Sequence, residues 1–318
     1  MVKLLQARAV LRWPSIPNGR TGSIVPPLGG RKVRLTAAVL SVLIGCWPAP
    51  PLAGIAQFAA RVSLVEVYAT VTDKDGHLVT GLRQDDFEVE ENGHPQVIQA
   101  FAAGAFPLSV AVGIDRSFSM TDRALAAAVT ATRALADRLK ADDQLMVIGI
   151  GSETEVLAPL STDRAGARRA LERLARWGTT PLFDAVIQAI DAVQPASGRR
   201  ALLLLSDGED RYSRAAASDV VAYARQHDVL IYPIAIGHAR VPVWAEVAAV
   251  SGGRSFAVRD HRELAGTITT IADELRHQYL LGYAPSSAAR SGWRSIKVRV
   301  ARPQTQVRAR DGYFAVER

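Results

Sequence analysis

The feature that most constrains the fold is a series of short apolar segments separated by amphipathic stretches. Within residues 105–276, the apolar segments have the length and content of buried strands, at 108–114, 144–150, 200–206, 229–236 and 254–258, with a further edge strand at 154–158. Helices are predicted between them, near 122–140, 163–176, 182–194, 213–227, 243–250 and 262–276. Apolar strands joined by helices form a mainly parallel sheet that is covered on both faces. The sequence therefore predicts an α/β domain with a doubly wound, mainly parallel sheet flanked by helices.

The first apolar segment runs directly into a short polar motif, Asp115-Arg-Ser117-Phe-Ser119. One carboxylate and two hydroxyls thus fall on a single turn at the carboxyl end of a strand, where ligands of open α/β sheets bind. Oxygen-only ligands suit a hard divalent cation and not zinc or copper. Asp and Ser are also favoured in helix caps and turns, so this motif alone leaves an ordinary turn as the alternative.

Two later segments supply further oxygen donors in the same pattern. Thr180 lies on a Gly-containing loop before a predicted helix, and Asp207 follows the apolar segment 201–205. In order and spacing, the three segments resemble the metal-ion-dependent adhesion site (MIDAS) of the von Willebrand factor A (VWFA) domain, over roughly residues 105–276.

That resemblance implies a ligand set and a cation. The set is Asp115, Ser117, Ser119, Thr180 and Asp207, and the cation is Mg²⁺, with Mn²⁺ or Ca²⁺ as alternatives. It also implies that one coordination position stays open for an Asp or Glu carboxylate donated by a partner protein.

Phe118 departs from the family, whose members commonly carry glycine or another small residue at this position. A bulky apolar side chain on a metal loop is a candidate partner contact. The alternative, which we adopt because single apolar residues need no special explanation, is that it packs beneath the loop.

The first 56 residues are predicted to form an export leader. They hold seven Lys and Arg and no Asp or Glu, so they account for the whole net charge of +7. The basic residues 31–34 precede an apolar run at 35–44 that is too short to span a membrane. Cys46, the only cysteine, lies in a segment that resembles a bacterial lipobox. Lipidation at Cys46 and ordinary cleavage near Ala53 both remain open, and each predicts an exported protein that is periplasmic, secreted or membrane-anchored through lipid alone.

The segments on either side of the α/β domain are predicted to be β-structure. Residues 57–104 hold three basic and eight acidic residues, whereas residues 290–318 hold eight basic and two acidic residues. Because each segment is too short to fold alone, we expect the two to form one small sheet or sandwich. The predicted division is a leader at 1–56, an N-terminal β segment at 57–104, a VWFA domain at 105–276 and a C-terminal β segment at 277–318 that pairs with 57–104. Both flanks also resemble the VWFA-related domain family common in Acidobacteria.

Other chemistries lack their motifs in this sequence. It has no His-Glu-x-x-His zinc motif, no Gly-x-Ser-x-Gly nucleophile motif and no phosphate-binding loop. The basic run 294–310 lacks interleaved aromatic residues, so no nucleic-acid partner is predicted. We expect an exported, metal-dependent protein-binding or adhesion module and not an enzyme. The alternatives are an exported metal-assisted hydrolase, for which the acid–base candidates are Asp184, Glu209 and Asp210, and a scaffold with a structural metal site.

Overall fold

The computed structural model describes residues 64–315, apart from 105, 238–240 and 286–290. All of them belong to one compact unit, Ala59–Arg318. The predicted leader, including Cys46, lies outside the described residues. None of the helices in the described ranges combines the length and apolar character that a membrane span requires.

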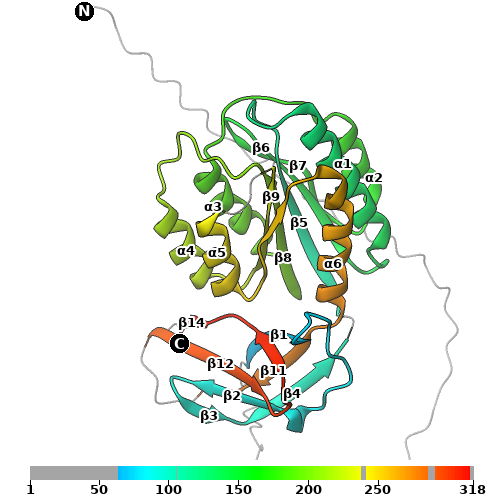
Figure 1. Cartoon of the computed structure of the whole chain (residues 1–318). Helices are drawn as coiled ribbons and strands as arrows, with labels where there is room; N and C mark the ends of the chain where they lie inside the picture. Colours follow the sequence, from blue (N-terminus) through cyan, green and yellow to red (C-terminus); the bar gives the residue numbers. More distant parts are fainter. Residues whose placement is uncertain (1–63, 105, 238–240, 286–290, 316–318) are drawn as a thin grey trace, which may run out of the picture. The chain divides into compact units, whose positions relative to one another are not determined.

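A six-stranded mixed sheet forms the centre of the α/β domain (Figure 1). Its strands, in spatial order, are β10 (Phe256–Val258), β9 (Leu230–Ile236), β8 (Arg199–Ser206), β5 (Leu108–Asp115), β6 (Gln144–Ile150) and β7 (Thr154–Ser161). Five of them run parallel, and only the edge strand β7 is antiparallel. Every residue of β5 is buried, as expected of a strand with helices over both faces. The predicted fold class is confirmed.

Three helices cover each face of this sheet (Figure 1). One face carries α1 (Asp122–Arg138), α2 (Arg164–Glu172) and α6 (Leu264–Arg276), preceded by the 3₁₀ turn His261–Glu263; the other carries α3 (Leu182–Val193), α4 (Ala217–Gln226) and α5 (Pro242–Ser251). Val110 and Val112 of β5 face the first group, whereas Ala111 faces the second. The prediction placed the start of α4 at residue 213, but the amides of Arg214 and Ala215 bond to the Asp184 carboxylate, so the helix begins later.

The flanking segments form two four-stranded antiparallel sheets that share one apolar core. One sheet holds β13 (Thr305–Arg308), β1 (Val65–Asp73), β11 (Tyr279–Tyr283) and β4 (Ile98–Ala103); the other holds β14 (Gly312–Ala315), β12 (Gly292–Val300), β2 (Phe87–Glu91) and β3 (His94–Gln96), with a 3₁₀ turn at Gln84–Asp86 before β2. Strands from the N-terminal and C-terminal flanks therefore pair in both sheets. The Asn92-Gly93 turn joins β2 only to the short strand β3, and the chain then crosses to the other sheet as β4.

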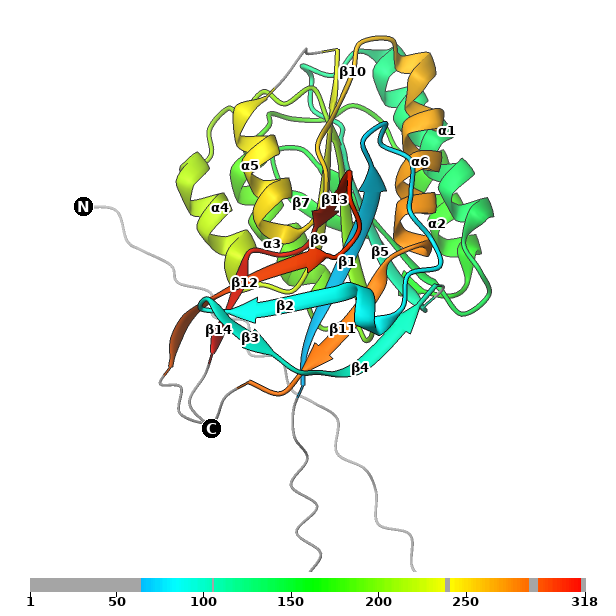
Figure 2. The same cartoon turned by 60° about the horizontal axis from the view of Figure 1, so that its bottom comes forward.

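The opposite charges of the two flanks meet across one pair of strands. Figure 2 shows β2 and β12 side by side, and their register sets Glu88 opposite Arg299 and Glu90 opposite Lys297. Arg299 forms an ion pair with Glu90. The buried Glu91 carboxylate accepts a hydrogen bond from Tyr283. The acidic N-terminal flank and the basic C-terminal flank thus pair with each other through β2 and β12.

Candidate metal centre

Three loops meet at the carboxyl end of the parallel strands. Strands β5 and β8 are neighbours, with Ile114 opposite Leu205, so Asp115 and Asp207 reach the same edge of the sheet. The loop that carries Thr180 is tied to the β5 loop, because the Phe118 amide donates to the Gly178 carbonyl at 3.0 Å. It is also tied to the loop after β8, because the Arg211 amide donates to the Thr180 carbonyl at 2.7 Å. Backbone hydrogen bonds therefore hold the three loops together.

Asp115 is the buried anchor of the site. It is the last residue of β5 and its exposed fraction is 0%. One carboxylate oxygen accepts the Ser117 amide at 2.9 Å, and the other accepts the Ser206 hydroxyl at 2.6 Å. The Ser117 and Ser119 hydroxyls lie 3.0 Å apart, with Ser117 buried and Ser119 exposed. The oxygen donors thus run from the interior to the surface.

Ser206 links the two carboxylate-bearing loops, a role that the sequence analysis did not assign. Its hydroxyl donates to Asp115 and accepts the Gly208 amide at 2.9 Å. Asp207, next to it, is nearly buried and accepts the Glu209 amide at 3.1 Å. The signal in the sequence that could have indicated this role is a hydroxyl at the end of an apolar strand, immediately before a carboxylate.

The electrostatics of the site favour a cation. Burial raises the pKa of Asp115 above its usual range, and the negative charge of Asp207 adds to this, although hydrogen bonds from Ser117 and Ser206 oppose it. Within the described part of the chain, no Lys, Arg or His forms an ion pair with Asp115 or Asp207. Two neighbouring carboxylates without a counter-charge, beside three hydroxyls, form a donor set that fits a hard divalent cation.

The five predicted ligand residues come to one edge of the sheet on these three loops. Thr180 is buried, with an exposed fraction of 2%. Their role as ligands stays a prediction. For Phe118 the packing interpretation is wrong, because its side chain is 66% exposed. The Phe118 amide is fixed to Gly178 while its ring projects into solvent.

The three acidic residues considered for acid–base chemistry all have partners within the loops. Asp184, in the first turn of α3, accepts the amides of Arg214 and Ala215. Asp210 accepts the Phe183 amide at 3.1 Å. Glu209 forms an ion pair with Arg211 at 2.6 Å. These carboxylates therefore shape the loops around the site.

A second group of potential metal ligands lies on the turn after β1. Asp73, Asp75 and His77 bring their side chains together there. In the sequence, the only sign of this group is the alternating spacing of the three side chains. Asp73 accepts the Asp75 and His77 amides, each at 2.9 Å, so its carboxylate already organises the turn.

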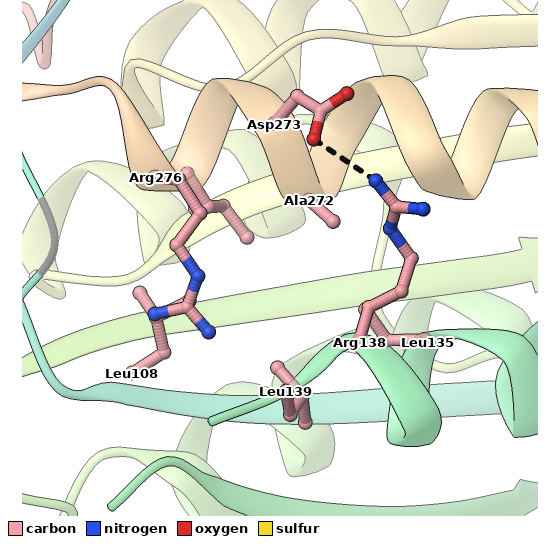
Figure 3. Close-up of a pocket in the computed structure, with 8 residues that line it drawn as sticks. Leu108, Leu135, Arg138, Leu139, Ala272, Asp273 and Arg276 are labelled. Atoms are coloured by element: carbon pink, nitrogen blue, oxygen red, sulfur yellow. Dashed lines mark hydrogen bonds and ion pairs between the residues drawn. The ribbon is translucent and has the colours of Figure 1, made fainter.

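A pocket of about 170 Å³ lies between α1 and α6, beside Leu108 at the other end of β5 (Figure 3). Figure 3 shows Arg138 pointing toward Asp273, to which it is joined at 3.2 Å. Arg276, which like Asp273 belongs to α6, forms an ion pair with the buried Asp143. Because both guanidinium groups are already paired with carboxylates, this pocket offers no free charge to a ligand.

Comparisons with known proteins support the architecture. Residues 110–209 match the family model of the von Willebrand factor type A domain. A search of curated protein sequences finds no match to the chain. A solved von Willebrand factor type A structure from Catenulispora acidiphila is similar at 16% identity, covering 79% of this chain and 73% of that one, with a TM-score of 0.50.

Two further solved structures are similar over a smaller share of this chain. BatB, a conserved hypothetical protein from Bacteroides thetaiotaomicron, is 18% identical over 54% of this chain and 97% of its own, with a TM-score of 0.45. Proximal thread matrix protein 1 from the mussel byssus, described with a zinc-occupied MIDAS motif, is 16% identical over 57% and 48%, with a TM-score of 0.47. At these identities the likeness concerns the fold alone.

Proposed function

We propose that the protein is a metal-dependent binding module, on the premise that residues 110–209 match the family model of the von Willebrand factor type A domain. The proposed ligands are Asp115, Ser117, Ser119, Thr180 and Asp207. The partner is a protein that donates an Asp or Glu carboxylate to the same cation. The observation that carries the proposal is the buried pair of carboxylates, which form no ion pair with any of the described residues, beside hydroxyls that open to the surface.

Asp115 and Ser119 have distinct parts in this proposal. Asp115 is held by the Ser117 amide and the Ser206 hydroxyl, so its charge stays in place at the base of the site. Ser119 is exposed and lies on the side from which a partner approaches. A divalent cation bound here, Mg²⁺ by our preference, would supply an electrophilic centre that attracts the carboxylate of the partner. Because the protein contributes few negative charges at the site, the cation keeps enough positive charge to attract an incoming carboxylate.

Calorimetric titration with Mg²⁺ tests the metal site. Asp207→Ala removes one of the two charges, so we expect no binding near millimolar Mg²⁺. Asp210→Asn is the matched control, because it removes the same charge from the same loop but keeps an oxygen for the Phe183 amide; its affinity should equal that of the wild type. Equal affinity in wild type and Asp207→Ala would refute the ligand assignment.

A peptide carrying one carboxylate tests the capture step. The probe is acetyl-Gly-Leu-Glu-Leu-Gly-amide, with the Gln peptide of otherwise identical sequence as its control. Binding followed by NMR should require both Mg²⁺ and the Glu carboxylate, and EDTA should abolish it. If the Glu and Gln peptides bind equally, or if neither binds the Mg²⁺-loaded protein, carboxylate capture is wrong.

We further propose that the module acts outside the cytoplasm. The support is the basic, apolar and Cys46-containing leader sequence. Cys46→Ser should release the protein from the membrane fraction if the cysteine carries lipid. A wild-type protein that is recovered soluble, with its mature N-terminus after Ala53, would exclude lipidation.

A further inference from the structure

The loops of the candidate metal centre carry an unusual share of exposed aromatic side chains. Within the described residues, the exposed Phe, Tyr and Trp residues are Phe118, Trp177, Tyr212, Trp293 and Phe314. Phe118, Trp177 and Tyr212 belong to the three loops of the site, one to each loop. We call these three residues the aromatic rim, and their exposed fractions are 66%, 43% and 78%.

The backbone holds the aromatic rim beside the proposed ligands. Phe118 lies between Ser117 and Ser119, and its amide bonds to the carbonyl of Gly178. The neighbouring Trp177 amide donates to the Arg116 carbonyl at 2.6 Å, and the Arg116 guanidinium lies 5.2 Å from the centre of the Trp177 ring. Tyr212 follows Arg211, whose amide bonds to the Thr180 carbonyl. All three aromatic residues therefore belong to one hydrogen-bonded surface.

The backbone of Tyr212 adopts a conformation that costs free energy. Its φ angle is +74°, a left-handed conformation that a bulky residue rarely adopts. The Tyr212 side chain nevertheless gains little burial, because it is 78% exposed. Backbone strain that stabilises no packing in the monomer is typical of positions where a residue serves binding.

Three arginines close to the aromatic rim each form an ion pair with a carboxylate. Arg116 pairs with Glu155 at 2.9 Å, and Arg176 pairs with Asp122 at 2.6 Å. Arg211 pairs with Glu209, as described above. Because these arginines already have carboxylate partners, the exposed aromatic rings are the feature of this surface that can attract the apolar part of a partner. Exposed aromatic residues contribute strongly to binding where a partner covers them.

We propose that the aromatic rim selects an acidic residue that is flanked by apolar side chains in a partner protein. This inference rests on the proposed function: the carboxylate binds at the metal centre while its apolar neighbours pack on Phe118 and Tyr212. Trp177 lies deeper in the surface, where a β-carbon added at Gly151 would come within 2.9 Å of its ring. Trp177 therefore supports the structure of its own loop as well as the proposed contact with the partner.

Two peptides and two variants test the proposal in the full-length protein. The probes are acetyl-Gly-Leu-Glu-Leu-Gly-amide and the same peptide with serine in place of both leucines, each titrated with Mg²⁺ present. The rim variant combines Phe118→Ser with Tyr212→Ser and leaves Trp177 intact. Phe314→Ser is the matched control, since it removes an exposed aromatic residue from β14, in the flanking sheets. Mg²⁺ affinity of each variant is measured in parallel to verify that the metal site is intact.

We expect the wild type and Phe314→Ser to bind the leucine peptide about tenfold more tightly than the serine peptide, because leucine burial stabilises the complex. In the rim variant this preference should disappear, while Mg²⁺ affinity and serine-peptide binding stay unchanged. Equal binding of both peptides to the wild type, with Mg²⁺ required, would overturn the role of the aromatic rim and leave carboxylate capture standing. A preference that persists in the rim variant would also overturn it. Failure of both peptides to bind the Mg²⁺-loaded wild type would overturn the proposed function and this inference together.

Discussion

Removal of the Asp143 carboxylate should strongly destabilise the fold, because this side chain has no exposed surface and three partners. It accepts the Leu108 amide at 3.0 Å, the Lys140 amide at 2.6 Å and the guanidinium of Arg276. These bonds join the start of β5, the end of α1 and the end of α6. Asp143→Ala would leave all three donors without this partner.

The magnitude follows from these contacts. A buried donor left unpaired costs about 1–3 kcal/mol, and breaking a buried ion pair by removing one partner costs about 3–5 kcal/mol. Because the Arg276 side chain keeps 16% exposure and regains some water, its ion pair counts near the low end of that range, and with the two amides we expect the free energy of unfolding to fall by at least about 4 kcal/mol. The neighbouring pair of Arg138 and Asp273 is the control: both side chains are nearly half exposed, so Asp273→Ala should cost less than about 1 kcal/mol.

Urea unfolding of EDTA-treated protein at pH 7 measures both variants. The pH dependence provides a second check. Burial would raise the pKa of Asp143, but the hydrogen bonds from Arg276 and from the Leu108 and Lys140 amides lower it below its ordinary value of 3.8. The stabilisation is therefore complete above that ordinary value and is lost as the pH falls through the lowered pKa. A loss below about 1 kcal/mol for Asp143→Ala, or a loss equal to that of Asp273→Ala, would refute this reasoning.

The remaining predictions concern the metal loops and the flanking sheets. Asp115→Asn should stabilise EDTA-treated protein at pH 7, because the raised pKa of Asp115 makes its charged form unfavourable once the pH exceeds that pKa. In the presence of Mg²⁺ the variant should lose the stabilisation of about 2.7 kcal/mol that the cation gives the wild type at a hundredfold excess over its dissociation constant. Melting curves with and without Mg²⁺ measure both effects, and an Asn variant still stabilised by Mg²⁺ would contradict the assignment. Gly178→Ala should weaken Mg²⁺ binding in calorimetry, because φ is +80° and the new β-carbon would lie 2.4 Å from the Ser152 hydroxyl; Gly166→Ala on α2, with open space around it, should bind Mg²⁺ normally. Deletion of residues 284–318 should speed hydrogen exchange in β2, whose partner β12 is lost, and unchanged exchange there would contradict the shared core.

Local periodicity in the sequence was sufficient to predict the α/β domain. Strands that are buried on both faces must be apolar at nearly every position, so β5 and β8 were visible as mainly apolar segments. The position of Asp115 directly after such a run was equally local, since the carboxyl ends of parallel strands meet at one edge. The opposite charges of the two flanks likewise indicated that their strands pair.

Other features were decided only by contacts between residues distant in the sequence. Phe118 projects into solvent because its loop is bonded to Gly178, and nothing in residues 115–120 records that contact. Ser206 bridges to Asp115 only because β8 lies beside β5 in register. The distribution of flank strands over two sheets also depends on partners far along the chain. A sequence pattern reports which residues resist water, whereas exposure and hydrogen-bond partners are set when separate segments pack together.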